Sequence, residues 1–419
     1  MNDTQQKHRT AWAIVGGIGI LAILIALPTM GLVVWLSSGG GDPLTVMLTG
    51  VGLLSLALGV GLTWAGVSGY HGLPAPKFYS VGGLGVLLLL TAGVLGLALL
   101  IPPARQTSAL FAPLHLGMIA FPALFLLLLI TWAAGREAAL TLRQLMVTLT
   151  GGAMTIIVAL PVELIGFMVS MLVVIIIADF VPGGEAELTR LMTLLEGWAE
   201  VPPTDMDEVL SILTSPLVIS VLGLTLAVVT PLIEELGKTL VLGAMGVFER
   251  AGLTRAYLWG VACGIGFAIL EGMTNGVLGL GETGGWLSGV GSRAMATVMH
   301  AITSGLIGLG WGITWRKRRS GWWALPLTYG GAVIIHGLWN FSTLLTIGGA
   351  GLGLGSTAAV EGMMLSATGI LIILGLLLFG LLALIGLPLW LRRYEAAHPE
   401  TTTPPQAQAP LTQSDGFPT

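Results

Sequence analysis

Seven ionisable side chains lie within apolar stretches between residues 225 and 345 of this sequence. Three of them are in the segment TPLIEELGKTL, residues 230–240, whose flanks are almost entirely Leu, Val, Ile, Ala and Gly. A charged residue near the centre of a membrane helix costs about 2.5–3.5 kcal/mol on insertion scales, so such residues point to a functional site. The set consists of Glu234, Glu235, Lys238, Glu271, Arg293, His300 and His336.

The spacing of these residues groups them on helix faces. Glu234 and Lys238 are four residues apart, so they share a face and partly neutralise each other, whereas Glu235 points about 100° away from Glu234. Pro231 favours a helix start or a kink there, which would bring Glu234 close to the positive end of a helix dipole. Three further sets share a face: Phe267, Glu271 and Asn275; Arg293 and His300; His336 and Asn340.

The composition indicates a membrane protein, because 54% of the 419 residues are hydrophobic and only 9% are charged. A soluble domain has roughly 25% charged residues. A run of about 20 apolar residues spans the bilayer, and the first run is too long for a removable signal peptide. We therefore predict an all-α, polytopic bundle of about ten transmembrane helices, at 11–36, 46–68, 80–102, 109–134, 152–178, 216–246, 256–280, 290–314, 322–348 and 364–391.

The distribution of Lys and Arg predicts the orientation of these spans. Thirteen of the 17 basic residues fall before the first span, in every second loop or after the last span, and only Arg105 and Arg190 fall in the intervening loops. Because basic residues accumulate on the cytoplasmic side, both termini are expected in the cytoplasm. The expected location is the plasma membrane of a bacterium or archaeon, crossed many times.

The chain is predicted to have five parts. The single cysteine, Cys263, excludes an internal disulfide and a zinc site built from cysteines. The acidic loop before the sixth span has apolar residues at helical spacing, which predicts an amphipathic helix on the outer surface. The parts are an N-terminal bundle of about five helices at 1–180, the extracytoplasmic loop at 181–215, a transmembrane core at 216–348, a C-terminal transmembrane helix at 349–393 and a disordered cytoplasmic tail at 394–419.

The polar residues of spans six to nine are expected at one depth in the membrane. At a rise of 1.5 Å per residue, Glu234, Glu271, His300 and His336 fall within roughly 5 Å of one another along the membrane normal. Four consecutive helices would thus bring two histidines and at least two carboxylates to one level. This convergence predicts a polar, water-accessible site.

Each residue also has a purely structural interpretation. A single Glu–Lys pair can hold a bundle together, and His336 with Asn340 can form interhelical hydrogen bonds. Arg293 can extend toward the membrane surface or pair with an acid. Glu163 and His115 lie outside the predicted cluster, and we interpret both as packing or gating residues.

Three kinds of chemistry suit buried carboxylates and histidines at one depth. A carboxylate can activate a water as general base while histidine and asparagine donate hydrogen bonds to an oxyanion. Two histidines and a glutamate can hold a catalytic zinc ion, although the sequence has no H-E-x-x-H segment, so the ligands would come from different helices. A transporter can use the same groups to relay protons.

The ordered motifs of this region resemble those of the PrsW-type intramembrane proteases. That family belongs to a superfamily with the CAAX prenyl endopeptidases and the bacteriocin-processing enzymes. The resemblance covers about 225–345. It rests on four elements in order: Glu234-Glu235-x-x-Lys238, Phe267-x-x-x-Glu271, an isolated His300, and His336-x-x-x-Asn340.

The resemblance implies hydrolysis of a peptide bond in a membrane-anchored protein, with a single-pass anti-sigma factor as the known substrate class. It implies that Glu234 polarises the water with support from Glu235 or Glu271, and that His300 shares in water activation. His336 and Asn340 would bind the oxyanion, and Lys238 would hold the glutamate pair. Phe267 and Arg293 would support the site.

Superfamily members are described both as glutamate-dependent and as metal-dependent. We favour the glutamate mechanism with no cofactor, because thiolate ligands and a local zinc motif are missing from the sequence; a zinc ion, if present, would be expected on His300, His336 and Glu271. The expected partners are the membrane-anchored substrate and the lipid bilayer, not nucleic acid. A catalytically inactive scaffold and a proton-coupled transporter remain the alternative functions.

Overall fold

The computed structural model describes residues 3–36, 42–200, 206–249, 251–317, 320–353 and 359–398. These residues form helices and short connections, with no strand among them. Ten helical stretches within the described residues are long and apolar enough to cross a membrane, which confirms the predicted all-α polytopic bundle. The orientation of the termini stays a prediction. Most of the predicted disordered tail, residues 399–419, lies outside the described residues, as do Arg250, Arg318 and Arg319.

The long helices differ from the predicted spans mainly at their ends, where polar residues extend the helix beyond the apolar run. The fifth helix, for example, begins ten residues before the predicted span, because Thr141 and Gln144 form a capping box that starts it at Leu142. The long helices are α1 Asp3–Leu36, α2 Pro43–Tyr70, α3 Val81–Leu99, α4 Ala112–Ala134, α5 Leu142–Ala178, α9 Thr230–Phe248, α10 Leu253–Asn275, α11 Thr283–Lys317, α12 Ala324–Gly353 and α13 Ala359–Ala397.

Short helices connect or extend these elements. The sixth span is composite, because α8 Pro216–Leu224 continues through a π-helical turn, η4 Thr225–Val229, directly into α9. The other short helices are η2 Pro103–Arg105, η3 Ala109–Phe111, α6 Gly184–Glu200, α7 Met206–Leu213 and η5 Gly276–Gly279.

Helix α10 forms the centre of the bundle and packs against α2, α4, α5, α9, α11 and α13. Its glycines allow a close approach to α11. Gly260 and Gly264 lie directly against backbone carbonyls of α11, and a Cβ at Gly264 would collide with the carbonyl of His300. Because α10 and α11 lie this close together, His300 has a fixed position along the helix axis relative to the next turn of α10.

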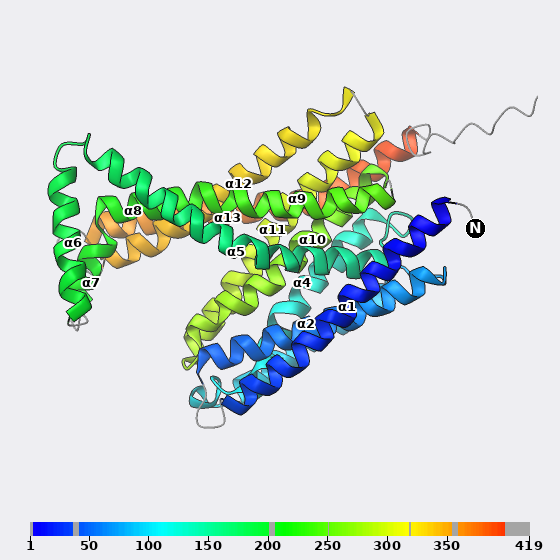
Figure 1. The fold of residues 1–419 in the computed structure, drawn as a ribbon, viewed down its shortest axis with the longest axis horizontal. Coiled ribbons are helices and arrows are strands. Elements are labelled where there is room, and N and C mark those ends of the chain that lie inside the picture. Colours follow the sequence, from blue (N-terminus) through cyan, green and yellow to red (C-terminus); the bar gives the residue numbers. More distant parts are fainter. Residues whose placement is uncertain are drawn as a thin grey trace, which may run out of the picture.

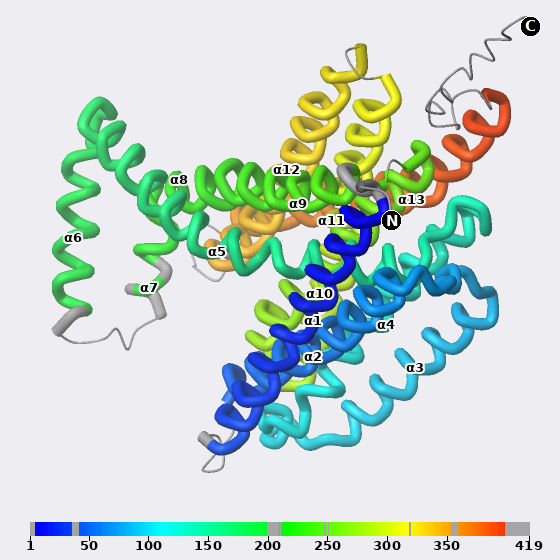
Figure 2. Tube along the Cα trace, turned by 45° about the vertical axis from the view of Figure 1, so that its right-hand side comes forward, coloured from blue at the N-terminus to red at the C-terminus, as the bar shows by residue number. Residues whose placement is uncertain are grey.

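The N-terminal helices surround one side of this centre. Helices α1 and α2 run side by side along much of their length (Figure 1). Helix α3 lies at the periphery, where among the described helices it packs extensively on α4 alone (Figure 2). Most of its apolar side chains are exposed, as expected for a helix whose surface faces lipid.

Helix α6 lies across the end of a projection formed by α5 and α8 (Figure 1). It buries Leu191 and exposes Met192 and Leu195. The Glu187 carboxylate ties it to the start of α8, since it accepts hydrogen bonds from Arg190 at 2.8 Å and from the Ser215 hydroxyl at 2.6 Å. These two bonds lower the pKa of Glu187 to about 2, so the group is ionised at neutral pH. The position of α6 on the outer membrane surface stays a prediction.

Candidate active site

The start of α9 is shaped by Pro231. A proline has no N–H, so a carbonyl in the preceding turn loses its backbone donor, and here the chain adopts the π-helical turn η4. The Asn340 amide on α12 donates to the carbonyl of Leu226 at 2.8 Å. Gly337, also on α12, lies against the carbonyl of Ala227 and has no room for a Cβ. Helix α12 is therefore attached to the π-helical turn immediately before Glu234.

This attachment gives a testable result for Gly337. Changing Gly337 to alanine should lower the unfolding temperature, because the added methyl group meets the Ala227 carbonyl. Changing Gly330 to alanine, on the same helix, should leave the unfolding temperature equal or higher: no atom lies within 4 Å of the added Cβ there, and alanine is favoured over glycine in a helix by about 1 kcal/mol. Thermal unfolding of both variants in detergent is the measurement. Equal unfolding temperatures would contradict the close packing of α12 on η4.

Glu235 is fully buried within the cluster. One of its oxygens, Oε1, accepts hydrogen bonds from three helices. The donors are Lys238 Nζ at 2.8 Å, His336 Nδ1 at 2.9 Å and Thr303 Oγ1 at 3.2 Å. Glu235 therefore joins α9, α11 and α12 and orients the groups around it. Thr303 carried no motif signal in the sequence.

The hydrogen bonds also define the tautomers of both histidines. A carboxylate only accepts, so His336 carries its proton on Nδ1 and leaves an unprotonated Nε2. An ammonium only donates, so His300 accepts from Lys238 at Nδ1, at 3.1 Å, and donates from Nε2 to Glu271 at 2.8 Å. The two imidazole rings are 5.0 Å apart in an edge-to-face arrangement.

Phe267 packs against the charged groups, and this contact explains why the motif includes an aromatic residue. The Lys238 ammonium is 4.0 Å from the centre of its ring, a cation–π contact, and the His300 ring is 4.8 Å away. The aromatic ring thus fills the space between two polar side chains without competing for their hydrogen bonds.

Glu271 forms the partly open side of the cluster. Its carboxylate pairs with Arg293 at 2.8 Å and accepts from Asn275 at 3.2 Å, so Arg293 pairs with an acid, one of the two alternatives that the sequence left open. The side chains of Glu271 and Arg293 are 21% and 19% exposed, compared with 0–2% for Glu235, Lys238 and both histidines. Access to the cluster is therefore from the C-terminal end of α10 and the N-terminal half of α11.

Glu234 has acceptor capacity to spare, and so does Glu235, whose Oε2 is likewise buried without a hydrogen-bond partner among the described residues. The Oε2 atom of Glu234 is buried and has no hydrogen-bond partner among the described residues. Lys238 Nζ lies 3.6 Å from it and the unprotonated His336 Nε2 lies 3.8 Å from it. Glu234 Oε2 and His336 Nε2 are therefore two acceptors 3.8 Å apart, and no described residue donates a hydrogen bond to Glu234 Oε2.

Glu163 belongs to the cluster, contrary to the sequence interpretation. Its carboxyl group on α5 lies beside that of Glu234, and its Oε1 is buried without a partner among the described residues. No pattern in the sequence indicates this contact, because Glu163 has no polar neighbour at helical spacing. His115, in contrast, takes part in packing: its Nδ1 accepts from Trp286 at 3.1 Å.

The residues present fit a metal ion in part. Ligand atoms of Glu234, His300 and His336 lie within 4.8 Å of one another. His336 donates its Nδ1 proton to a carboxylate and leaves Nε2 free, which is the usual arrangement of a metal-binding histidine. This set contains Glu234 in place of the predicted Glu271, whose oxygens are bound to Arg293 and His300.

The arrangement suits hydrolysis, because acceptors for the protons of a water lie next to fixed positive charge.

The sequence profile described as "PrsW family intramembrane metalloprotease" matches residues 141–368, more than half of the chain. The match begins where α5 begins and includes Glu163 as well as the four motifs. Comparisons with curated proteins and with solved structures gave no significant match. With ten membrane-spanning helices and these motifs in order, the chain belongs to the PrsW family of intramembrane proteases.

Proposed function

We propose that this protease cleaves a membrane-anchored, single-pass protein, with a water activated between Glu234 and His336. The observation that carries the proposal is the pair of acceptors, Glu234 Oε2 and His336 Nε2, 3.8 Å apart. A water has two protons to donate, and acceptors at this separation suit one water that binds both. Its oxygen lone pair then points away from both acceptors, toward a substrate carbonyl.

The proposed reaction is general base catalysis. Glu234 takes a proton from the water as the oxygen attacks the carbonyl carbon, and the C–N bond then breaks as the amine leaving group takes up that proton. Lys238 provides the nearest positive charge to Glu234, at 3.6 Å, and stabilises the developing oxyanion electrostatically. Asn340 keeps one amide N–H for the oxyanion, since the other donates to Leu226.

The remaining polar residues hold this arrangement in place. Glu235 fixes the proton of His336 on Nδ1 and anchors Lys238. Glu271 holds His300 from the other side, and Arg293 neutralises Glu271. These contacts support roles of orientation for Glu235, Glu271 and Arg293, and a direct role for Glu234.

A glutamate mechanism is favoured by the position of Lys238. Its ammonium lies 3.1 Å from His300 Nδ1 and 3.6 Å from Glu234 Oε2, so a positive charge already lies beside two of the three candidate metal ligands. A divalent ion bound by the same atoms would be repelled at this distance. In the alternative, zinc held by Glu234, His300 and His336 would act as Lewis acid on the water.

Measuring the metal content of the purified protein separates the two mechanisms. We expect well under one zinc ion per chain by elemental analysis, and no rise in unfolding temperature when zinc is added. A control variant, His336→Ala, should then give the same metal content as the unchanged protein. One zinc ion per chain, lost in His336→Ala, would contradict the glutamate mechanism and establish the metal site.

Reconstitution tests the proposed activity. The purified protein is incorporated into liposomes with a panel of single-pass membrane proteins, including anti-sigma-factor-like ones, and new termini are mapped by mass spectrometry. We expect one or few cleavage sites in or beside the transmembrane segment of the substrate. If no panel member is cut by the folded protein, the proposed substrate class is wrong.

A further inference from the structure

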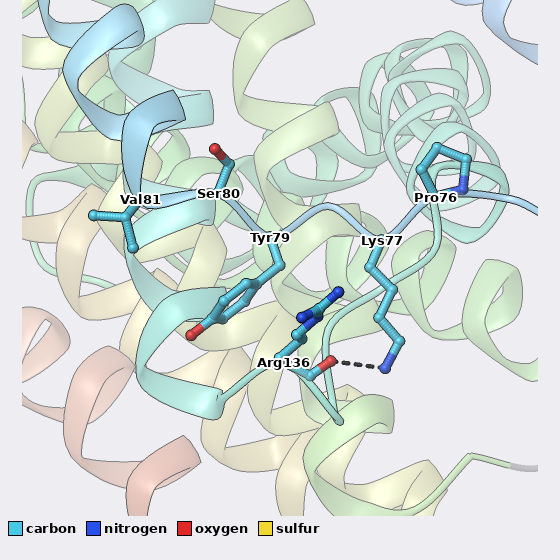
Figure 3. Close-up of a pocket in the computed structure, with 6 residues that line it drawn as sticks. All are labelled: Pro76, Lys77, Tyr79, Ser80, Val81 and Arg136. Atoms are coloured by element: carbon cyan, nitrogen blue, oxygen red, sulfur yellow. Dashed lines mark hydrogen bonds between the residues drawn. The ribbon is translucent and has the colours of Figure 1, made fainter.

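A second polar feature lies away from the cluster, at the ends of the second to fifth spans. It is a cavity of about 550 Å³ between the segment 71–80, which links α2 to α3, and the segment 135–141, which links α4 to α5 (Figure 3). None of its residues takes part in the candidate active site. The lining consists of Pro76, Lys77, Tyr79, Ser80, Val81 and Arg136.

The walls of the cavity are held by bonds between the two segments. The N–H of Phe78 donates to the carbonyl of Leu140 at 2.7 Å, and the N–H of Leu142 donates to Pro76 at 2.8 Å. Lys77 Nζ donates to the carbonyls of Arg136 and Glu137, at 2.7 and 2.9 Å. The shape of the cavity is thus set by hydrogen bonds between two connecting segments, and it does not depend on one exposed loop.

The cavity contains positive charge with unused donors. The Arg136 guanidinium makes no hydrogen bond or ion pair with any other described residue, and Lys77 Nζ keeps one of its three protons. Figure 3 shows this guanidinium between the Tyr79 ring and the Lys77 side chain. Partial burial and the nearby Arg255 lower the pKa of Lys77, and Glu137 opposes that shift only in part. An anion in the cavity would relieve this repulsion.

The position of the cavity indicates what kind of anion it meets. It lies where α2 ends at Tyr70, α3 begins at Val81 and α4 ends at Ala134, which is the depth of lipid headgroups for helices that span a bilayer. Val81 is 64% exposed. It is the first residue of α3, whose apolar surface is also exposed, for example at Leu88 and Leu89. An amphiphile therefore finds cations at one end of this surface and an apolar helix along the rest.

We infer that this cavity binds the phosphate-containing headgroup of an anionic phospholipid, with the acyl chains lying along α3. Arginine suits this role because its planar guanidinium donates two parallel hydrogen bonds to a phosphate. Lys77 adds a second charge, and Tyr79 and Ser80 add hydroxyl groups to the wall. The site is independent of the proteolytic cluster, so it stands whichever hydrolytic mechanism operates.

Binding measured by native mass spectrometry tests the inference. The full-length protein in dodecyl maltoside is titrated with dioleoyl phosphatidylglycerol, with dioleoyl phosphatidylcholine and with inorganic phosphate. Arg136→Gln should weaken phosphatidylglycerol binding by about tenfold or more, because it removes the guanidinium charge and its two parallel donors; tenfold corresponds to about 1.4 kcal/mol. The matched control is Lys317→Gln, which removes a charge from the last turn of α11, outside the cavity lining.

The expected result is stronger binding of phosphatidylglycerol than of phosphatidylcholine, lost in Arg136→Gln and kept in Lys317→Gln, at unchanged unfolding temperatures. Equal phosphatidylglycerol affinity of Arg136→Gln and the unchanged protein would overturn the site. Displacement of the lipid by inorganic phosphate alone would overturn the assignment to a lipid in favour of a free phosphate.

Discussion

Glu234→Gln is expected to lower the rate of peptide cleavage by about 100- to 10,000-fold, the usual contribution of a general base. The substitution keeps the size of the side chain and removes only its basicity. Because Glu234 Oε2 has no hydrogen-bond partner among the described residues, the fold should tolerate glutamine there. Cleavage of a reconstituted single-pass substrate and thermal unfolding of the same preparation measure the two effects separately.

The matched control for this variant is Glu361→Gln, at the exposed start of α13 and outside the cluster. It should retain the full cleavage rate. If Glu234→Gln cleaves as fast as the control, Glu234 is not the base, and the water would have to be activated by another group of the cluster.

Lys238→Met is expected to be the most destabilising single substitution in the cluster. Lys238 is fully buried and bridges Glu235 and His300, so its removal leaves the Glu235 carboxylate without a cationic partner. Breaking a buried ion pair in this way costs about 3–5 kcal/mol. The unfolding temperature in detergent should fall strongly, and cleavage should be lost with it.

A double variant shows whether the stability lost in Lys238→Met arises from the unpaired charge of Glu235. Glu235→Gln combined with Lys238→Met removes both charges, so it should unfold at a higher temperature than Lys238→Met alone. Lys317→Met, a lysine exposed at the end of α11, should change stability by less than about 0.5 kcal/mol. Purely additive effects of the two cluster substitutions would show that Lys238 and Glu235 are not coupled.

The spans and the meeting of the motif helices at one level could be predicted because each depends on a local property of the sequence. A span requires about 20 apolar residues, and the depth of a residue follows from 1.5 Å of rise per residue. Both hold without knowledge of which helices are neighbours. The apolar runs therefore identified ten spans, and the four motif helices do meet through Glu235, Lys238, Glu271 and both histidines.

The sequence could not predict contacts between helices distant along the chain. Glu163 has its polar partner on α9, 71 positions later, and nothing on its own helix indicated this. The Asn340 amide binds the Leu226 carbonyl because Pro231 and the π-helical turn free that oxygen, a consequence of backbone geometry rather than side-chain spacing. Glu271 was expected as a zinc ligand only if a zinc ion were present, and its ion pair with Arg293 explains why Glu234 fits that set better.

The most direct measurement compares full-length and truncated single-pass membrane proteins in cells that carry either the unchanged chain or Glu234→Gln/Glu235→Gln at equal abundance. If the cluster hydrolyses a membrane-anchored protein, one such protein accumulates at full length only with the double variant, and its truncated form appears only with the unchanged chain. If the two sets of membrane proteins are identical under every inducing stress tested, the cluster does not act as a protease in those cells, and a scaffolding role becomes the better explanation.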